Sequence, residues 1–394
     1  MVQLKERLWT KNFLIVSAIY FCLTIVSFLL NTIIILYATE KYHVSTGMGG
    51  IISGIFVFGG LAGRLLSETF SQKLGSRKTI FIFLSLFMIT TGLYFGDFGV
   101  TFLKINRFLH GFTLGVVSTL VGTIVAFIVP RSRKGEGISY YNMAGTLATA
   151  FGPFIGLLLR QYYGFKIVFL FCFSMSIVGL VIGLFLQVPT NMVKELESAE
   201  KSSRNKISIE KKALPISFII LMTAFCYSSV LGYMNVYAVE VHLEAAATYF
   251  YLVYGIAVFC TRPITGALLD KKGANIVMYP AFILFGIGML LLGNASHSAT
   301  FLLASIFLGI GFGNIQSCTQ VIAVNSVTAN RIGAATATFF IFFEVGSGLG
   351  PAILGSIIPI IGYPLLYVTL GLIGAATIIP YYLLCGKRRE CNNL

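Results

Sequence analysis

RLLSETFSQKLG at residues 64–75 and RPITGALLDKKG at residues 262–273 are two copies of one pattern, 198 residues apart. Each copy begins with an arginine (Arg64, Arg262) and ends with a glycine (Gly75, Gly273) two residues after a lysine. Before Arg64 the offset becomes 200. A fixed offset indicates a duplicated structural unit, so two homologous halves are predicted. The offset of 198 also aligns Gly111 with Gly309, Gly115 with Gly313, Arg133 with Arg331, Gly152-Pro153 with Gly350-Pro351, and Gly164 with Gly362.

Apolar runs surround both copies, six in each half. Of the 394 residues, 57% are hydrophobic and 11% are charged, whereas soluble proteins carry about 25% charged residues. A transmembrane helix needs about 20 consecutive apolar residues. The sequence therefore predicts an all-α polytopic membrane protein with twelve transmembrane helices in two pseudo-symmetric six-helix bundles, and it excludes soluble enzymes, secreted disulfide scaffolds and single-pass receptors. The runs cover about 13–38, 47–67, 79–96, 99–129, 138–159, 165–188, 215–239, 246–269, 275–293, 300–327, 332–357 and 362–385.

The polar segment 189–214 separates the two halves. The predicted domains are an N-terminal bundle at 1–188, a cytoplasmic linker at 189–214 and a C-terminal bundle at 215–394. Most of the 28 Lys and Arg residues lie in segments that share one side with the N-terminus. The positive-inside rule then predicts that both termini are cytoplasmic. The net charge of +14 is explained by this topology, so no nucleic-acid partner is expected.

Other chemistry finds little support in the sequence. The seven cysteines are scattered and form no CxxC pair, so no metal, cofactor or disulfide framework is expected. No GxxxxGK[ST] phosphate-binding loop is present, which argues against an ATP-driven pump. A membrane receptor is a further class, and it is disfavoured because the linker is too short for an appended soluble domain.

Four segments resemble motifs of the major facilitator superfamily. RLLSETFSQKLGSRK (64–78) and its second copy are similar to the loop after span 2, although Gln72 and Glu68 replace the family's acid and glycine. RFLHGFTLG (107–115) resembles the buried-arginine motif of span 4. GTLATAFGPFIG (145–156) and GSGLGPAILG (346–355) resemble the antiporter motif of the twelve-span drug and metabolite exporters.

This resemblance implies a secondary transporter and not an enzyme. Parallel repeats of this kind bind substrate between the halves near mid-membrane and work by alternating access. The expected protein is a proton-coupled exporter of small amphipathic molecules, functional as a monomer in a bacterial plasma membrane. The alternative is an importer, a symporter of a small anionic metabolite or sugar. The expected partners are the substrate, protons and the lipid bilayer.

Charged and kinked positions near the span ends are candidate gating residues. Charges there can reach across and latch a gate, or they can serve only as positive-inside anchors. Small residues at helical spacing let helices approach closely, which fits either ordinary packing or a hinge. The gating candidates are Arg64, Glu68, Gly75, Arg77, Arg262, Asp270, Gly273, Gly152, Pro153, Gly350 and Pro351.

Three ionisable residues within the spans are candidates for proton coupling. Glu344 lies in the middle of an apolar run, where a carboxylate is expensive and usually functional. Arg107 is a positive charge within the fourth span, and His110 follows it by one helical turn. The alternatives are a hydrogen-bonded neutral Glu344, an Arg107 that extends to the outer surface, and a His110 that only donates and accepts hydrogen bonds.

A polar stripe along the first span predicts one wall of a substrate cavity. Ser17, Tyr20, Thr24, Ser27 and Asn31 follow a spacing of three and four residues, which is one face of a helix. Other spans carry similar polar positions. The cavity candidates are Thr24, Ser27, Asn31, Asn142, Thr146, Tyr227, Gln316 and Gln320.

Overall fold

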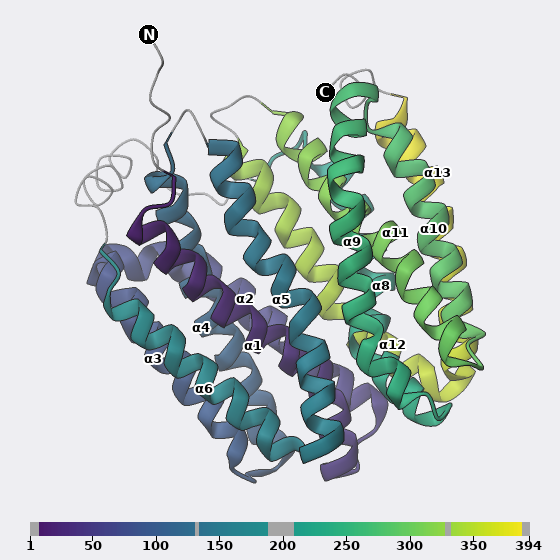
Figure 1. Ribbon diagram of the computed structural model, residues 1–394, viewed down its shortest axis with the longest axis horizontal. Coiled ribbons are helices and arrows are strands. Elements are labelled where there is room, and N and C mark those ends of the chain that lie inside the picture. The colour runs from purple at the N-terminus through teal and green to yellow at the C-terminus, as the bar shows by residue number, and fades with distance from the viewer. Residues whose placement is uncertain (1–7, 131–133, 188–208, 328–331, 388–394) are drawn as a thin grey trace. The chain divides into compact units, whose positions relative to one another are not determined.

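The computed structural model describes residues 8–130, 134–187, 209–327 and 332–387 (Figure 1). All regular structure within these ranges is helical, which confirms the all-α prediction. Most of the predicted linker 189–214 lies outside the described residues, so the predicted domain boundary stays a prediction.

The helices follow the apolar runs of the sequence closely. The first half contains α1 (Lys11–Tyr42), α2 (Thr46–Leu74), α3 (Ser76–Gly92), α4 (Gly99–Ile128), α5 (Lys134–Tyr163) and α6 (Phe165–Leu184), with one 3₁₀ turn at Leu93–Phe95. In the second half, the helices are α8 (Leu214–Glu240), α9 (Glu244–Lys272), α10 (Asn275–Gly293), α11 (Ser298–Asn325), α12 (Ile332–Ala376) and α13 (Ile378–Tyr381), followed by a π-helical turn at Tyr382–Gly386.

Among the described residues, eleven helices are long and apolar enough to cross a membrane. The last of them, Ala335–Gly386, has 52 residues, which is far more than one crossing needs. It contains Gly362 in a non-helical conformation, with φ of 74° and ψ of 167°. This break falls between the two spans expected at 332–357 and 362–385, so within the described residues the eleven stretches correspond to the twelve predicted spans.

The contacts group the chain into two compact units. Unit 1 comprises Met1–Leu30 and Phe58–Lys206, and unit 2 comprises Asn31–Val57 and Ile207–Leu394. In unit 1, α3 packs beside both α4 and α6 (Figure 1). In unit 2, α12 packs on α8 and α10, while α11 packs on α9 and α10. The last turns of α1 and the first turns of α2 thus belong to unit 2.

The backbone repeats between the halves at the loops. Gly75 and Gly273 begin equivalent loops with φ of 82° and 83°, and Gly164 and Gly362 have φ of 79° and 74°. Residues with a side chain rarely adopt such angles, which explains why glycine stands at both copies. Two histidines in the loops after α1 and α8, His43 and His242, have positive φ of 51° and 58°. The duplicated sequence therefore folds into duplicated turns.

Candidate functional site

The glycines aligned by the repeat lie where helices touch within each unit. In unit 1, a Cβ built on Gly115 of α4 would lie 2.1 Å from the carbonyl oxygen of Gly60 on α2. In unit 2, a Cβ on Gly309 of α11 would lie 2.7 Å from the carbonyl oxygen of Tyr254 on α9. These helix pairs approach so closely that no side chain fits between them.

The two antiporter-like segments pack in the same way. Gly152 of α5 faces α1, and its ideal Cβ lies 3.0 Å from the carbonyl oxygen of Ile25. Gly350 of α12 faces α8, and its ideal Cβ lies 3.1 Å from the carbonyl oxygen of Phe225. Ile25 and Phe225 are themselves 200 residues apart. The adjacent Pro153 and Pro351 are each inside their helix, where proline removes a backbone hydrogen bond.

The predicted gating charges are only partly described. Arg77 Nη2 donates to the carbonyl oxygen of Leu184 at 3.5 Å, which connects the start of α3 to the end of α6. Arg64 and Arg262 are half-buried, and the Nε atom of each is shielded from solvent. The side chains of Glu68 and Asp270 lie outside the described set, so their predicted pairing stays a prediction.

Arg107 and His110 belong to a buried polar cluster in unit 1. Both side chains are 0% exposed. Arg107 Nη1 donates to the hydroxyl of Tyr94 at 3.5 Å, and that hydroxyl is 3.3 Å from His110 Nδ1. His110 Nε2 is 3.2 Å from the Thr91 hydroxyl. The cluster continues to Ser176 on α6, whose hydroxyl donates to Thr91 at 3.2 Å.

Glu344 lies in unit 2, twelve residues after the start of α12 and well before the break at Gly362. The side chain is half-buried, and its Oε2 atom is shielded from solvent. The residues immediately before it are Ile341, Phe342 and Phe343. A carboxylate is therefore held at mid-span in an apolar stretch.

The predicted cavity residues differ in what their polar groups do. Thr24 and Ser27 are buried, and their hydroxyls donate to the carbonyl oxygens of Tyr20 and Leu23 at 2.7 Å in each case. Thr146 donates weakly to the carbonyl oxygen of Asn142, at 3.3 Å. A hydroxyl that donates its single proton to its own helix has no proton to donate to a ligand. The amide side chains differ: Asn142 is exposed, whereas Asn31, Gln316 and Gln320 are half-buried.

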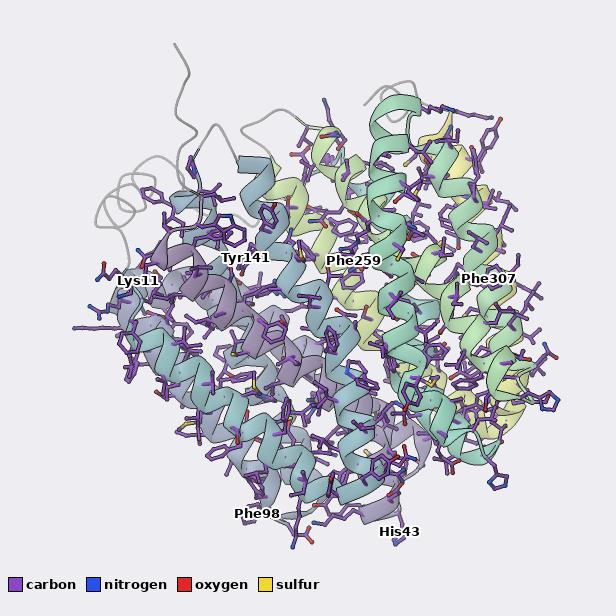
Figure 2. The ribbon with its side chains drawn as sticks, in the orientation of Figure 1. Lys11, His43, Phe98, Tyr141, Phe259 and Phe307 are labelled. Atoms are coloured by element: carbon purple, nitrogen blue, oxygen red, sulfur yellow. The ribbon has the colours of Figure 1, made fainter. Side chains whose placement is uncertain are left out.

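Aromatic pairs accompany these residues in each unit. In unit 1, Tyr141 of α5, labelled in Figure 2, stacks on Tyr20 of α1 with ring centroids 4.5 Å apart. In unit 2, the predicted cavity residue Tyr227 is 4% exposed and stacks on Phe312 at 3.9 Å and on Tyr254 at 5.7 Å. Tyr227 is thus enclosed by other rings of its own unit.

Two polar residues that the sequence analysis did not single out hold the start of α2 in unit 2. The Tyr233 hydroxyl of α8 donates to the carbonyl oxygens of Thr46, at 3.0 Å, and of Pro351. The Thr46 hydroxyl donates to the carbonyl oxygen of Gly355 at 2.8 Å. The sequence does contain a sign of this contact. Pro359 stands four residues after Gly355 and has no N–H to donate to the carbonyl of Gly355, which therefore needs another donor.

Known proteins resemble this chain over most of its length. The family model described as Major Facilitator Superfamily matches residues 16–351. A relative from Methanocaldococcus jannaschii, an uncharacterized MFS-type transporter, is 24% identical over 327 residues, which cover 81% of this chain and 84% of the relative.

Solved structures share the fold. A POT family transporter in complex with 5-aminolevulinic acid has a TM-score of 0.76 at 13% identity, covering 94% of this chain and 95% of its own. The nucleoside transporter NupG has a TM-score of 0.75 at 12% identity, covering 95% and 99%. The human organic anion transporter MFSD10 has a TM-score of 0.68 at 15% identity, covering 97% and 100%.

Proposed function

Since this chain belongs to the major facilitator superfamily, a family of integral membrane transporters and not of enzymes, we propose that it is a proton-coupled exporter of small amphipathic molecules. Members of the family bind small molecules and typically work as monomers. The proposed cycle is alternating access, in a bacterial plasma membrane with both termini in the cytoplasm.

Glu344 is the observation that carries the proton step. An ionised carboxylate in the middle of a span is costly, and protonation removes that cost. If Glu344 takes up a proton from one side and releases it on the other, the proton gradient drives the conformational change. Its position in α12, with Oε2 shielded from solvent, supports this role.

Arg107 and His110 enter the proposal as a fixed positive charge and a group that can gain a proton. Their hydrogen bonds to Tyr94 and Thr91 also favour a role in holding α3 and α4 together. The same burial weakens the alternative of an importer in which Arg107 binds a substrate carboxylate. Glu344 is therefore the acid on which the proposal rests.

The direction of transport is inferred from the antiporter-like segments and not from the fold. The fold is shared with a nucleoside transporter and an organic anion transporter, and likeness of fold does not set direction. Gly152-Pro153 and Gly350-Pro351 pack α5 on α1 and α12 on α8, and we propose that these four residues act in gating together with the basic loops. The proposed substrate contacts are the amides of Asn31, Asn142, Gln316 and Gln320.

Proteoliposomes loaded with ethidium, a small amphipathic cation, test the proposal. An inward-directed proton gradient is expected to drive ethidium out through the wild-type protein. The Glu344→Gln variant is expected to bind ethidium but to lose gradient-driven flux, because its side chain cannot release a proton. Glu240→Gln is the control, since Glu240 lies exposed at the end of α8.

Two results would overturn the proposal. Full proton-driven flux in Glu344→Gln would remove the role of Glu344. Uptake of a carboxylate such as 5-aminolevulinic acid together with protons, without ethidium export, would establish the importer instead.

A further inference from the structure

The first turns of α2 are bound to the second half of the chain by side-chain hydrogen bonds. Thr46 begins α2 and belongs to unit 2 together with α8 and α12. Its hydroxyl donates to the carbonyl oxygen of Gly355 at 2.8 Å, and its own carbonyl accepts from the Tyr233 hydroxyl at 3.0 Å. Thr46 is thus both a donor to α12 and an acceptor from α8.

The acceptor on α12 is a carbonyl that its own helix cannot satisfy. In an α-helix the carbonyl of residue 355 accepts from the amide of residue 359. Residue 359 is a proline inside α12 and has no N–H to donate. The Thr46 hydroxyl supplies the missing hydrogen bond, and this partner is available only while the start of α2 lies on α12.

Tyr233 adds a second connection at the same place. Its ring is 0% exposed, and its hydroxyl donates to carbonyls on both α2 and α12. A hydroxyl has a single proton, so Thr46 and Pro351 share one donor. Glycine makes this possible, because a Cβ on Gly50 would lie 2.2 Å from the Tyr233 hydroxyl and one on Gly355 would lie 2.1 Å from it.

We propose that Thr46 and Tyr233 are positioning residues that hold the start of α2 against α8 and α12, and that their hydrogen bonds to Gly355 and Pro351 break and re-form in each transport cycle. We call Thr46, Tyr233, Pro351 and Gly355 the Thr46 latch. The inference rests on the alternating access of the proposed function. A transporter that works by alternating access closes toward one side of the membrane at a time, and we assign these hydrogen bonds to one of the two closed states.

The latch residues lie on α2, α8 and α12, and their repeat equivalents on α9, α1 and α5 cannot form the same hydrogen bonds. The offset of 198 aligns Thr46, the first residue of α2, with Glu244, the first residue of α9, and it aligns Gly355 with Leu157. The offset of 200 in the first span aligns Tyr233 with Ile33. None of these aligned residues carries a side-chain hydroxyl. Gln161 stands at the position equivalent to Pro359, so no proline leaves the carbonyl of Leu157 without its helical donor. The latch therefore stabilises one of the two closed states and not the other.

Hydrogen–deuterium exchange of the purified protein in lipid nanodiscs tests the latch without any substrate. Exchange of a protected amide follows the equilibrium of local opening. Removing one hydrogen bond is worth roughly a five- to tenfold change in such an equilibrium. Thr46→Val and Tyr233→Phe are each expected to raise exchange in peptides from residues 46–57 by about that factor, whereas Thr46→Ser, which keeps the hydroxyl, is expected to match the wild type.

Tyr367→Phe is the matched control. Tyr367 is also 0% exposed, and its hydroxyl donates to the carbonyl oxygen of Ser229 at 3.3 Å, which joins α12 to α8 without touching the start of α2. Its loss should leave exchange in residues 46–57 unchanged. This arrangement separates a latch from the general cost of removing a buried tyrosine hydroxyl.

Two outcomes would overturn the inference. One is unchanged exchange in residues 46–57 in both Thr46→Val and Tyr233→Phe. The other is an equal increase in Tyr367→Phe, because the effect would then be a loss of packing throughout unit 2. Since exchange is read without ethidium or a proton gradient, this test can fail while the Glu344 experiment succeeds, and the reverse also holds.

Discussion

Replacement of Gly115 by alanine tests whether the repeat glycines are required by helix contact. A Cβ at Gly115 would lie 2.1 Å from the carbonyl oxygen of Gly60 and 3.0 Å from the amide nitrogen of Arg64. Both are backbone atoms of α2 and cannot turn aside as a side chain does. Ordinary contact starts at 3.4 Å, so α4 must move away by about 1.3 Å, the difference between 3.4 Å and 2.1 Å.

The expected cost of Gly115→Ala follows from that displacement. Inserting a methyl group into a packed contact costs about 1–3 kcal/mol, and a clash between backbones falls at the upper end. Gly122→Ala is the matched control on the same helix, because its Cβ would meet only the Tyr141 hydroxyl, at 3.9 Å. Alanine there gains up to about 1 kcal/mol of helix propensity. The two variants should therefore differ by about 3 kcal/mol in free energy of unfolding.

Thermal unfolding of the purified protein in detergent measures this difference. A domain of 150–250 residues shifts its Tm by about 2–4 °C per kcal/mol, so Gly115→Ala should melt about 6–12 °C below Gly122→Ala. A thiol-reactive dye can follow the exposure of Cys22 and Cys172, which are buried in unit 1. Melting temperatures within about 2 °C of each other would refute the reasoning, since the helices would then accommodate the methyl group at no cost.

Two further variants test single features of the fold and of the candidate cavity. Gly362→Ala places a side chain at φ of 74° and ψ of 167°, a conformation that is essentially restricted to glycine, and it should cost about 1–3 kcal/mol in thermal unfolding. The control is Gly266→Ala, which lies inside α9, meets no atom within 4 Å, and should melt at or slightly above the wild-type temperature because alanine favours the helix. Ser27→Ala should leave the KM for ethidium within about twofold of wild type, because the hydroxyl already donates to the carbonyl of Leu23. The KM is measured from proton-driven flux at increasing ethidium concentrations. A larger change in KM would mean that the Ser27 hydroxyl contacts the substrate, contrary to its hydrogen bond with Leu23.

Much of the fold could be predicted because it depends on local composition. Apolar run length sets the spans, and the offset of 198 predicted equivalent structure at Gly75 and Gly273. The structure supplies the reason, a positive φ at both glycines. Gly362 was predicted only as the partner of Gly164, and it is the residue that divides α12.

The partners of the candidate site residues could not be predicted in the same way. Periodicity placed Thr24 and Ser27 on one face of α1, but it does not show where a hydroxyl proton points, and both donate to their own helix. Arg107 and His110 were recognised as intramembrane polar groups, whereas their link through Tyr94 depends on how α3 packs beside α4. Pro359, which the sequence analysis leaves out, shows that the carbonyl of Gly355 lacks a helical donor, but the sequence does not show that Thr46 supplies one.

The one-sided Thr46 latch also bears on the history of the chain. Two identical halves would carry the hydroxyls and the proline in both reciprocal pairings or in neither. Here Thr46, Tyr233 and Pro359 are present in one pairing, while Glu244, Ile33 and Gln161 stand in the other. If the two halves were identical at the duplication, this difference arose afterwards, and it gives the proposed latch to one pairing of the halves alone.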